Sequence, residues 1–345
     1  METMKCIEGK ILTEDGFKKG YILTKNQESA TIQFGEPRMK SRKKGLIIPT
    51  FINAHTHIGD VFIREKQTDL PHDIEQLVAP PNGIKHRLLT QTNTEEIQTG
   101  MIHGLQELKK HGISTFVDFR ENGYAGIKLL QNALQQIPLD SIILGRPESL
   151  TAYKTEIDQL LQHADGIGLS SIIDWNFDDA SLVAERTKKE NKIFAVHVSE
   201  RIREPISSVL SLKPTFIVHM TQATIKDLKQ VKAEQIPIVI CPRSNHFFKS
   251  KPNILQMKKA GNIILLGTDN FMLHQPSILE EIRFIQTHFP NLFSLEELLS
   301  MNTYHARRVF NRDYSKSEGI VPQSWMMLDP ITLQIDTIFE SVNVA

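Results

Sequence analysis

The stretch GLIIPTFINAHTH, residues 45–57, joins a run of apolar side chains to two histidines. The apolar run predicts a buried β-strand at 45–55. His55 and His57 are spaced i, i+2, which on an extended chain directs both imidazoles to the same side. Neutral imidazoles that converge on one point can bind zinc or another borderline divalent ion. Taken alone, the His-x-His pattern is weak evidence.

Seven further apolar runs, rich in Ile and Val, alternate with amphipathic stretches of helical length. This alternation indicates repeated βα units, an α/β class and a parallel sheet, and eight strands are the number that closes a (β/α)8 TIM-like barrel. A doubly wound open sheet would give a similar pattern. The further predicted strands are 113–119, 140–145, 166–174, 192–198, 215–219, 236–240 and 262–269, and helices are predicted at 95–111, 154–163, 178–190, 224–234 and 276–288.

The two ends of the chain differ from its middle. Residues 1–44 and 318–345 contain short strand-like runs, which we predict to pair into a small β-domain beside a barrel of residues 45–317. Residues 66–94 contain three prolines and follow the first barrel strand as a long loop. Such a loop is often a lid or a binding loop, and a disordered insertion is the alternative.

The composition argues against several classes of partner. Forty basic and forty acidic residues give a formal net charge of zero, so no overall field favours nucleic acid or an anionic membrane. Cys6 and Cys241 form no disulfide framework, which indicates a reducing compartment. Neither a signal-peptide core nor an 18-residue apolar run is present. We therefore expect a cytoplasmic protein with a small-molecule substrate; the sequence leaves a homo-oligomer open.

Further metal-ligand side chains recur at the ends of later predicted strands. His197 ends the strand 192–198, His219 ends 215–219, and Asp269 ends 262–269. Barrel enzymes place their catalytic groups at the C-terminal ends of strands. A single histidine at a strand end is more often structural, but agreement across four strands favours one shared site.

Five motifs in this order make the chain resemble the amidohydrolase superfamily. The resemblance is to the branch that contains cytosine, guanine, adenosine-type and S-adenosylhomocysteine deaminases together with triazine chlorohydrolases. It covers nearly the whole chain and rests on IPTFINAHTH (48–57), HVSE (197–200), IVHMT (217–221), CPRSN (241–245) and LLGTDN (265–270).

The resemblance implies a site for one divalent metal ion, zinc first and iron as the alternative. It assigns the ligands as His55, His57, His197 and Asp269. It also implies that Glu200 is the proton shuttle and that His219 lies beside the activated water and the scissile carbon. Some members bridge two metals with a carboxylated lysine on the fourth strand, but residues 166–174 contain no lysine. A mononuclear site is therefore expected.

These residue types also make a coherent hydrolytic chemistry without the family. A divalent metal lowers the pKa of a bound water to about 7. Asp269 can take the proton of that water, and Glu200 can protonate the ring nitrogen beside the attacked carbon. His219 can donate a hydrogen bond to the oxygen as charge develops there. This chemistry predicts hydrolytic deamination of a small aminated heterocycle, such as a nucleobase, a nucleoside or a pterin-like compound.

Residues that follow other strands are candidates for substrate selection: Arg146, Glu148, Trp175, Arg243 and His246. The chain departs from the family where residues 320–329 read IVPQSWMMLD rather than Gly-x-x-Ala-Asp, and where Arg201 replaces the usual Thr. Substrate identity is therefore not transferred. Hydrolysis of an amide, a cyclic amide or a carbon–halogen bond stays an alternative, as does a non-catalytic metal-binding or regulatory barrel.

Overall fold

The computed structural model describes residues 5–25, 30–39, 41, 43–66, 69–80, 82–312, 314–315, 319–320 and 322–344. It has two compact units: one of Met1–Ile52, Lys109–Ser114 and Phe293–Ala345, and one of Asn53–Leu108 and Thr115–Leu292. The predicted division into 1–44 with 318–345 and 45–317 stays a prediction, and its limit at 317 and 318 lies outside the described residues. None of the described helices has the length and apolar character needed to cross a membrane.

The larger unit is built around a curled parallel sheet of nine strands, which confirms the predicted α/β class and TIM-like barrel. The last strand pairs in parallel with the first, Asp269 opposite Thr56, so the two ends of the sheet meet. In sheet order the strands are β12 (Ile264–Leu266), β11 (Ile238–Ile240), β10 (Phe216–His219), β9 (Ile193–Val198), β8 (Gly166–Leu169), β7 (Asp140–Gly145), β6 (Ile113–Arg120), β5 (Phe51–His57) and β13 (Asp269–Asn270).

Three predicted strands were wrong in extent. The run 45–55 is two strands, because β4 (Lys43–Pro49) pairs in another sheet and ends at Pro49, whose nitrogen has no proton to donate. The run 166–174 stops at Leu169 and continues as a single turn, η2 (Ile172–Asp174). The run 262–269 is divided between β12 and β13.

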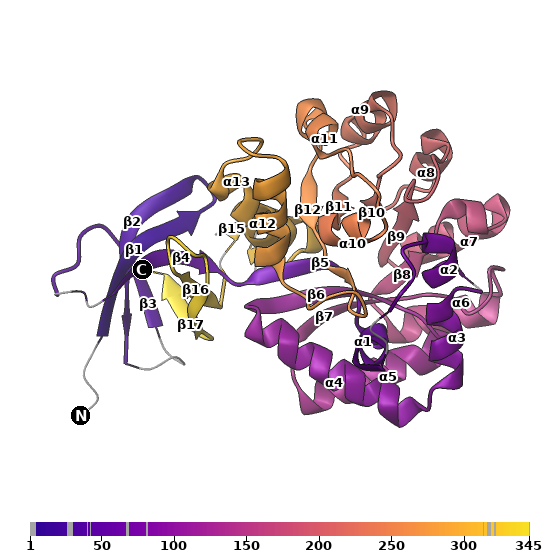
Figure 1. Ribbon diagram of the computed structural model, residues 1–345, viewed down its shortest axis with the longest axis horizontal. Coiled ribbons are helices and arrows are strands. Elements are labelled where there is room, and N and C mark those ends of the chain that lie inside the picture. Colours follow the sequence, from indigo (N-terminus) through magenta and orange to yellow (C-terminus); the bar gives the residue numbers. More distant parts are fainter. Residues whose placement is uncertain are drawn as a thin grey trace. The chain divides into compact units, whose positions relative to one another are not determined.

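Helices alternate with the strands, as Figure 1 shows along the colour gradient from β5 to β12. The predicted loop 66–94 carries two helices of its own, and its residues 67, 68 and 81 lie outside the described residues. The helical elements are η1 (Ile58–Asp60), α1 (Val61–Lys66), α2 (Ile74–Leu77), α3 (Ile84–Gln91), α4 (Thr94–Lys110), α5 (Gly123–Gln136), α6 (Lys154–His163), α7 (Phe177–Lys189), α8 (Ile206–Ser211), α9 (Ile225–Ala233), α10 (Pro242–Phe247), α11 (Ile254–Ala260), α12 (Ile278–His288), α13 (Leu295–Ser300), η3 (Met301–His305) and α14 (Ala306–Phe310).

The smaller unit contains a mixed seven-stranded sheet made from both ends of the chain, as predicted. Its buried face is apolar, and Ile11, Ile22, Ile47 and Trp325 are among its core residues. In sheet order the strands are β17 (Ile335–Phe339), β16 (Trp325–Leu328), β4, β1 (Lys5–Thr13), β2 (Gly16–Thr24), β3 (Ala30–Phe34) and β18 (Val342–Val344), and a separate pair is β14 (Tyr314–Ser315) with β15 (Gly319–Ile320).

Candidate metal centre

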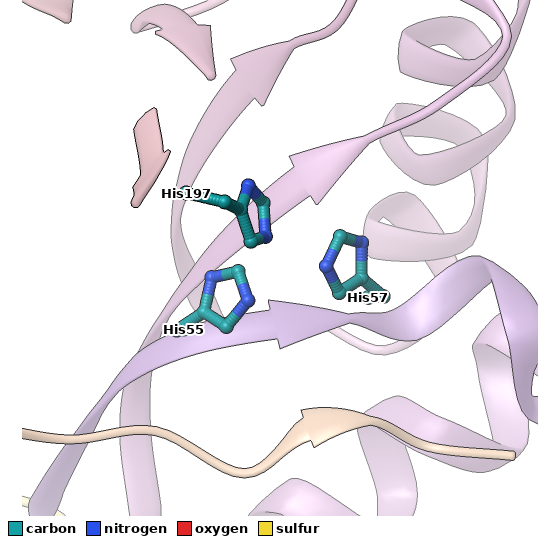
Figure 2. A group of neighbouring side chains, drawn as sticks. All are labelled: His55, His57 and His197. Carbon is teal, nitrogen blue, oxygen red and sulfur yellow. The ribbon is translucent and has the colours of Figure 1, made fainter. Parts of the chain in front are cut away.

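Three histidines meet at the C-terminal ends of β5 and β9. Figure 2 shows the rings of His55, His57 and His197 facing a common space. One nitrogen from each ring lies within 4.8 Å of the others, and all three residues are buried. The alternation of the extended β5 puts His55 and His57 on the same side, as their spacing predicts.

Asp269 and His219 extend this cluster. Ligand atoms of His55, His219 and Asp269 also lie within 4.8 Å of one another. Oδ1 of Asp269 is 3.3 Å from Nε2 of His55 and 3.5 Å from Nε2 of His57. The structure thus brings together all four predicted metal ligands and His219.

Both strand-end residues that complete the cluster have left-handed backbones. His219 has a φ of 76° and Asp269 a φ of 58°. This region is unfavourable for residues with a Cβ and is found disproportionately at functional sites. The side chain of Asp269 is held in place by Ser244, whose hydroxyl donates to Oδ2 over 2.5 Å.

Two contacts fix the orientation of the histidine rings. Nδ1 of His197 lies 2.8 Å from the carbonyl oxygen of Leu169, and Nδ1 of His57 lies 2.7 Å from Oε1 of Glu121. A backbone carbonyl oxygen only accepts, so Nδ1 of His197 carries the proton and its Nε2 keeps the lone pair. Nδ1 of His57 faces the carboxylate of Glu121 at close range, although this contact is not a well-directed hydrogen bond. A metal-binding histidine commonly donates its second ring N–H in this way.

The electrostatics of the cluster fit a divalent cation. Burial lowers the pKa of His55 to about 4 and that of His57 to about 3, and it lowers the pKa of His197 well below its usual value. Neutral imidazoles are the form that binds a metal. Within the described residues neither ring nitrogen of His55 makes a well-directed hydrogen bond, although Asp269 lies near Nε2. The buried nitrogens and the carboxylate together form a donor set suited to zinc.

Glu200 lies beside this cluster. Its Oε1 is 3.5 Å from Nε2 of His219, and burial raises the pKa of its carboxyl group. Asp269 differs: although burial alone would raise its pKa, His55 and the other neighbouring histidines hold it well below the usual value. The two carboxyl groups are therefore biased toward opposite protonation states, which is the arrangement that separates an acid from a base.

A cleft opens over the cluster. Of the predicted substrate residues, Arg146 lines it, whereas Glu148, Trp175, Arg243 and His246 are not among the described residues that line it. Trp175 is buried near Ser170, and Nη1 of Arg243 lies 3.5 Å from Glu281. Their substrate roles stay predictions. The lining residues are His57, Ile74, Val78, Ala79, Pro80, Lys85, Arg146, Ser170, Ser171, Ile173, Asp174, His197, Glu200, Arg201, Ile202, Glu204, His219, Asp269 and Asn270.

Two buried charged residues of the cleft, Lys85 and Glu204, are among those that had no functional assignment from the sequence. Lys85 of α3 is almost fully buried, and its Nζ lies 2.7 Å from Oε1 of Glu121. Glu204 is also buried, and burial raises its pKa to about 8. For Glu121 there was a weak indication of a functional role in the sequence, because this residue directly follows a strand. No local pattern indicated such a role for Lys85 or Glu204.

Comparisons with known sequences agree with this architecture. The model of the amidohydrolase family matches residues 46–317. An uncharacterised protein of Methanocaldococcus jannaschii is 34% identical over a 364-residue alignment that covers 99% of this chain and 90% of that protein. A 5-methylthioadenosine/S-adenosylhomocysteine deaminase of Pyrococcus abyssi is 23% identical over 307 residues, 77% of this chain and 69% of that protein.

Solved structures share the fold at low sequence identity. An adenosine deaminase from Xanthomonas campestris with bound zinc has a TM-score of 0.72 and 14% identity, covering 95% of this chain and 85% of that one. The atrazine chlorohydrolase TrzN from Arthrobacter aurescens TC1, complexed with zinc, has a TM-score of 0.70 and 13% identity, covering 94% and 87%. At these identities the likeness establishes the fold alone.

Proposed function

The chain belongs to the amidohydrolase family, and from that premise we propose that it is a metal-dependent hydrolase that deaminates a small aminated heterocycle. One observation carries the proposal: Glu200, His219 and Asp269 line one cleft and lie beside the buried cluster of three histidines. One divalent ion, with zinc as the first candidate, would be held by His55, His57, His197 and Asp269. Such an ion lowers the pKa of a bound water to about 7 and so supplies hydroxide near neutral pH.

Asp269 is the proposed base. Its carboxylate is the form that accepts a proton, and its pKa lies well below the usual value. It accepts one proton of the attacking water while the water oxygen forms a bond to the ring carbon that carries the amino group. Ser244 fixes Oδ2 of Asp269 through its hydroxyl, which leaves Oδ1 toward the histidines.

Glu200 is the proposed acid. Its raised pKa favours the protonated form, which donates to the ring nitrogen next to the attacked carbon. The carbon is then tetrahedral. The proton held by Asp269 passes to the amino group, the carbon–nitrogen bond breaks, and ammonia departs. The proton left on the hydroxyl group passes to the carboxylate of Glu200, which restores the acid and leaves a carbonyl on the ring. His219 donates a hydrogen bond to the oxygen as its negative charge grows.

Names of related proteins support a deaminase over the other hydrolases of this fold. The relative from Pyrococcus abyssi is named for two adenine nucleosides, and a structural neighbour is a guanine deaminase from C. acetobutylicum. The chlorohydrolase neighbour keeps carbon–halogen hydrolysis as the second candidate. An acid beside the attacked carbon suits both, since the two reactions differ only in the leaving group.

The test is product release by the zinc-loaded protein. The panel contains 5′-methylthioadenosine, S-adenosylhomocysteine, adenosine, guanine, cytosine, a pterin, a cyclic amide and a chlorinated triazine, with ammonia, ring opening and chloride measured. We expect ammonia from at least one aminated ring and loss of that activity after chelation. Chloride release alone supports the second candidate, and ring opening alone supports hydrolysis of a cyclic amide. A metallated protein that binds the compounds and turns none over supports the non-catalytic barrel.

A further inference from the structure

Glu121 is not a proposed metal ligand, but its buried carboxylate contacts the proposed ligand His57. Glu121 follows β6, and its side chain is 3% exposed. Its Oε1 lies 2.7 Å from Nδ1 of His57, the nitrogen that faces away from Asp269. A carboxylate in this position orients the imidazole and increases the electron density on the opposite nitrogen.

Glu121 is itself fixed on both oxygens. Oε1 also lies 2.7 Å from Nζ of Lys85, and Oε2 accepts a hydrogen bond of 2.6 Å from Nη2 of Arg120. Arg120 in turn contacts Asp118, and Lys85 bonds the side-chain oxygen of Asn270 over 2.8 Å. Arg146 lies farther away, with its Nη1 3.8 Å from Oε1. With cations beside both oxygens, the carboxylate cannot rotate away from His57 without breaking an ion pair.

We propose that Glu121 is a positioning residue for the metal ligand His57, and that Lys85 of the cleft-lining helix α3 holds it in that role. The inference rests on the proposed metal centre. The inference predicts that the affinity of the centre for the ion depends on Glu121, although Glu121 is not a ligand of the ion. The alternative is that Glu121 only neutralises the charges of the buried Lys85 and Arg120 and has no part in metal binding.

Glu121→Gln separates these alternatives, because it keeps the size of the side chain and removes the charge that pairs with His57. Asp60→Asn is the matched control. Asp60 is equally buried and its Oδ2 lies 3.3 Å from the same Lys85, but it contacts Met272 rather than a ligand histidine. The probe is Zn²⁺ itself, titrated against a chromophoric chelator, with circular dichroism and thermal unfolding of each metal-free variant.

We expect Glu121→Gln to bind Zn²⁺ about 10- to 100-fold more weakly than the wild type, and Asp60→Asn to bind like the wild type. Equal affinity in the wild type and folded Glu121→Gln overturns the inference, and so does an equal loss in both variants.

If Glu121→Gln does not fold, Glu121→Asp replaces it, because it keeps the charge for Lys85 and Arg120 but draws the oxygen back from His57. Unchanged affinity in that variant overturns the inference. A wild type that binds no Zn²⁺ refutes the proposed function instead.

Discussion

Oδ1 of Asp269 lies 3.3 Å from Nε2 of His55, although the two residues come from the last and the first strand of the curled sheet. The parallel pairing of β13 with β5 sets Asp269 opposite Thr56, next to His55. Closure of the sheet therefore forms the centre: the carboxylate joins the histidines only when the final strand docks. Metal binding and completion of the barrel are expected to be thermodynamically linked.

Glu200→Gln is expected to keep zinc and the fold but to lose about 10²- to 10⁴-fold in kcat, because an amide cannot protonate the ring nitrogen. The measurement is steady-state ammonia release per bound metal on the substrate found in the panel. Glu185→Gln on the exposed face of α7 is the control and should keep wild-type turnover. A fully metallated Glu200→Gln with near wild-type kcat would refute the acid role.

Arg146→Ala is expected to weaken binding of the substrate's transition state, since Arg146 lines the cleft. Loss of a charged hydrogen bond costs about 1.5–3 kcal/mol, or roughly 10- to 100-fold in kcat/KM. Arg186→Ala removes an equal charge on α7 and is the control. Metal content is measured in both, and an unchanged kcat/KM in Arg146→Ala would show that its guanidinium does not reach the substrate.

Local signals in the sequence predicted the residues of the metal centre that lie on strands or at strand ends. His55 and His57 follow from the i, i+2 spacing, and His197, His219 and Asp269 follow from their places at strand ends. The first rule depends only on backbone geometry within one strand, and the second adds the expectation that the strand ends of a barrel converge, so a single sequence is enough to apply both.

The rest of the centre depends on contacts between elements. Lys85 belongs to a stretch that we predicted as loop, and its position beside Glu121 is set by how that stretch folds over the strand ends. The division of 45–55 into β4 and β5 likewise depends on which sheet each half pairs with. The spacing of apolar residues within one element does not show which other element it contacts, so neither of these features could be predicted from it.

Stability should fall as pH rises because of Glu204. Burial raises its folded pKa to about 8 from the ordinary 4.5, and Asp174 adds to the shift. The folded state then holds a proton that the unfolded chain has released, so this contribution is fully present below pH 4.5 and is lost toward pH 8. Urea unfolding across this range should show Glu204→Gln gaining stability over the wild type as pH increases. A pH-independent difference would contradict the assigned shift.

Gly59→Ala is expected to destabilise the larger unit. An added Cβ would lie 2.1 Å from Nη2 of Arg120, whose guanidinium is buried and pinned by Asp118 and Glu121. Overpacking of this kind costs about 1–3 kcal/mol in the free energy of unfolding. In Gly145→Ala, the control, the nearest atom would be at 3.1 Å, so a smaller loss is expected. Equal losses in denaturant titrations would show that Arg120 can move.

The central claim is tested most directly by the metal content of the purified protein. Elemental analysis of the wild type, expressed in zinc-supplemented medium and dialysed without chelator, should give about one equivalent of zinc per chain, in line with a mononuclear site of His55, His57, His197 and Asp269. His55→Ala, which removes the most buried imidazole, should give far less while keeping its circular dichroism spectrum. A wild type with no transition metal, or a His55→Ala variant that retains a full equivalent, would contradict the account.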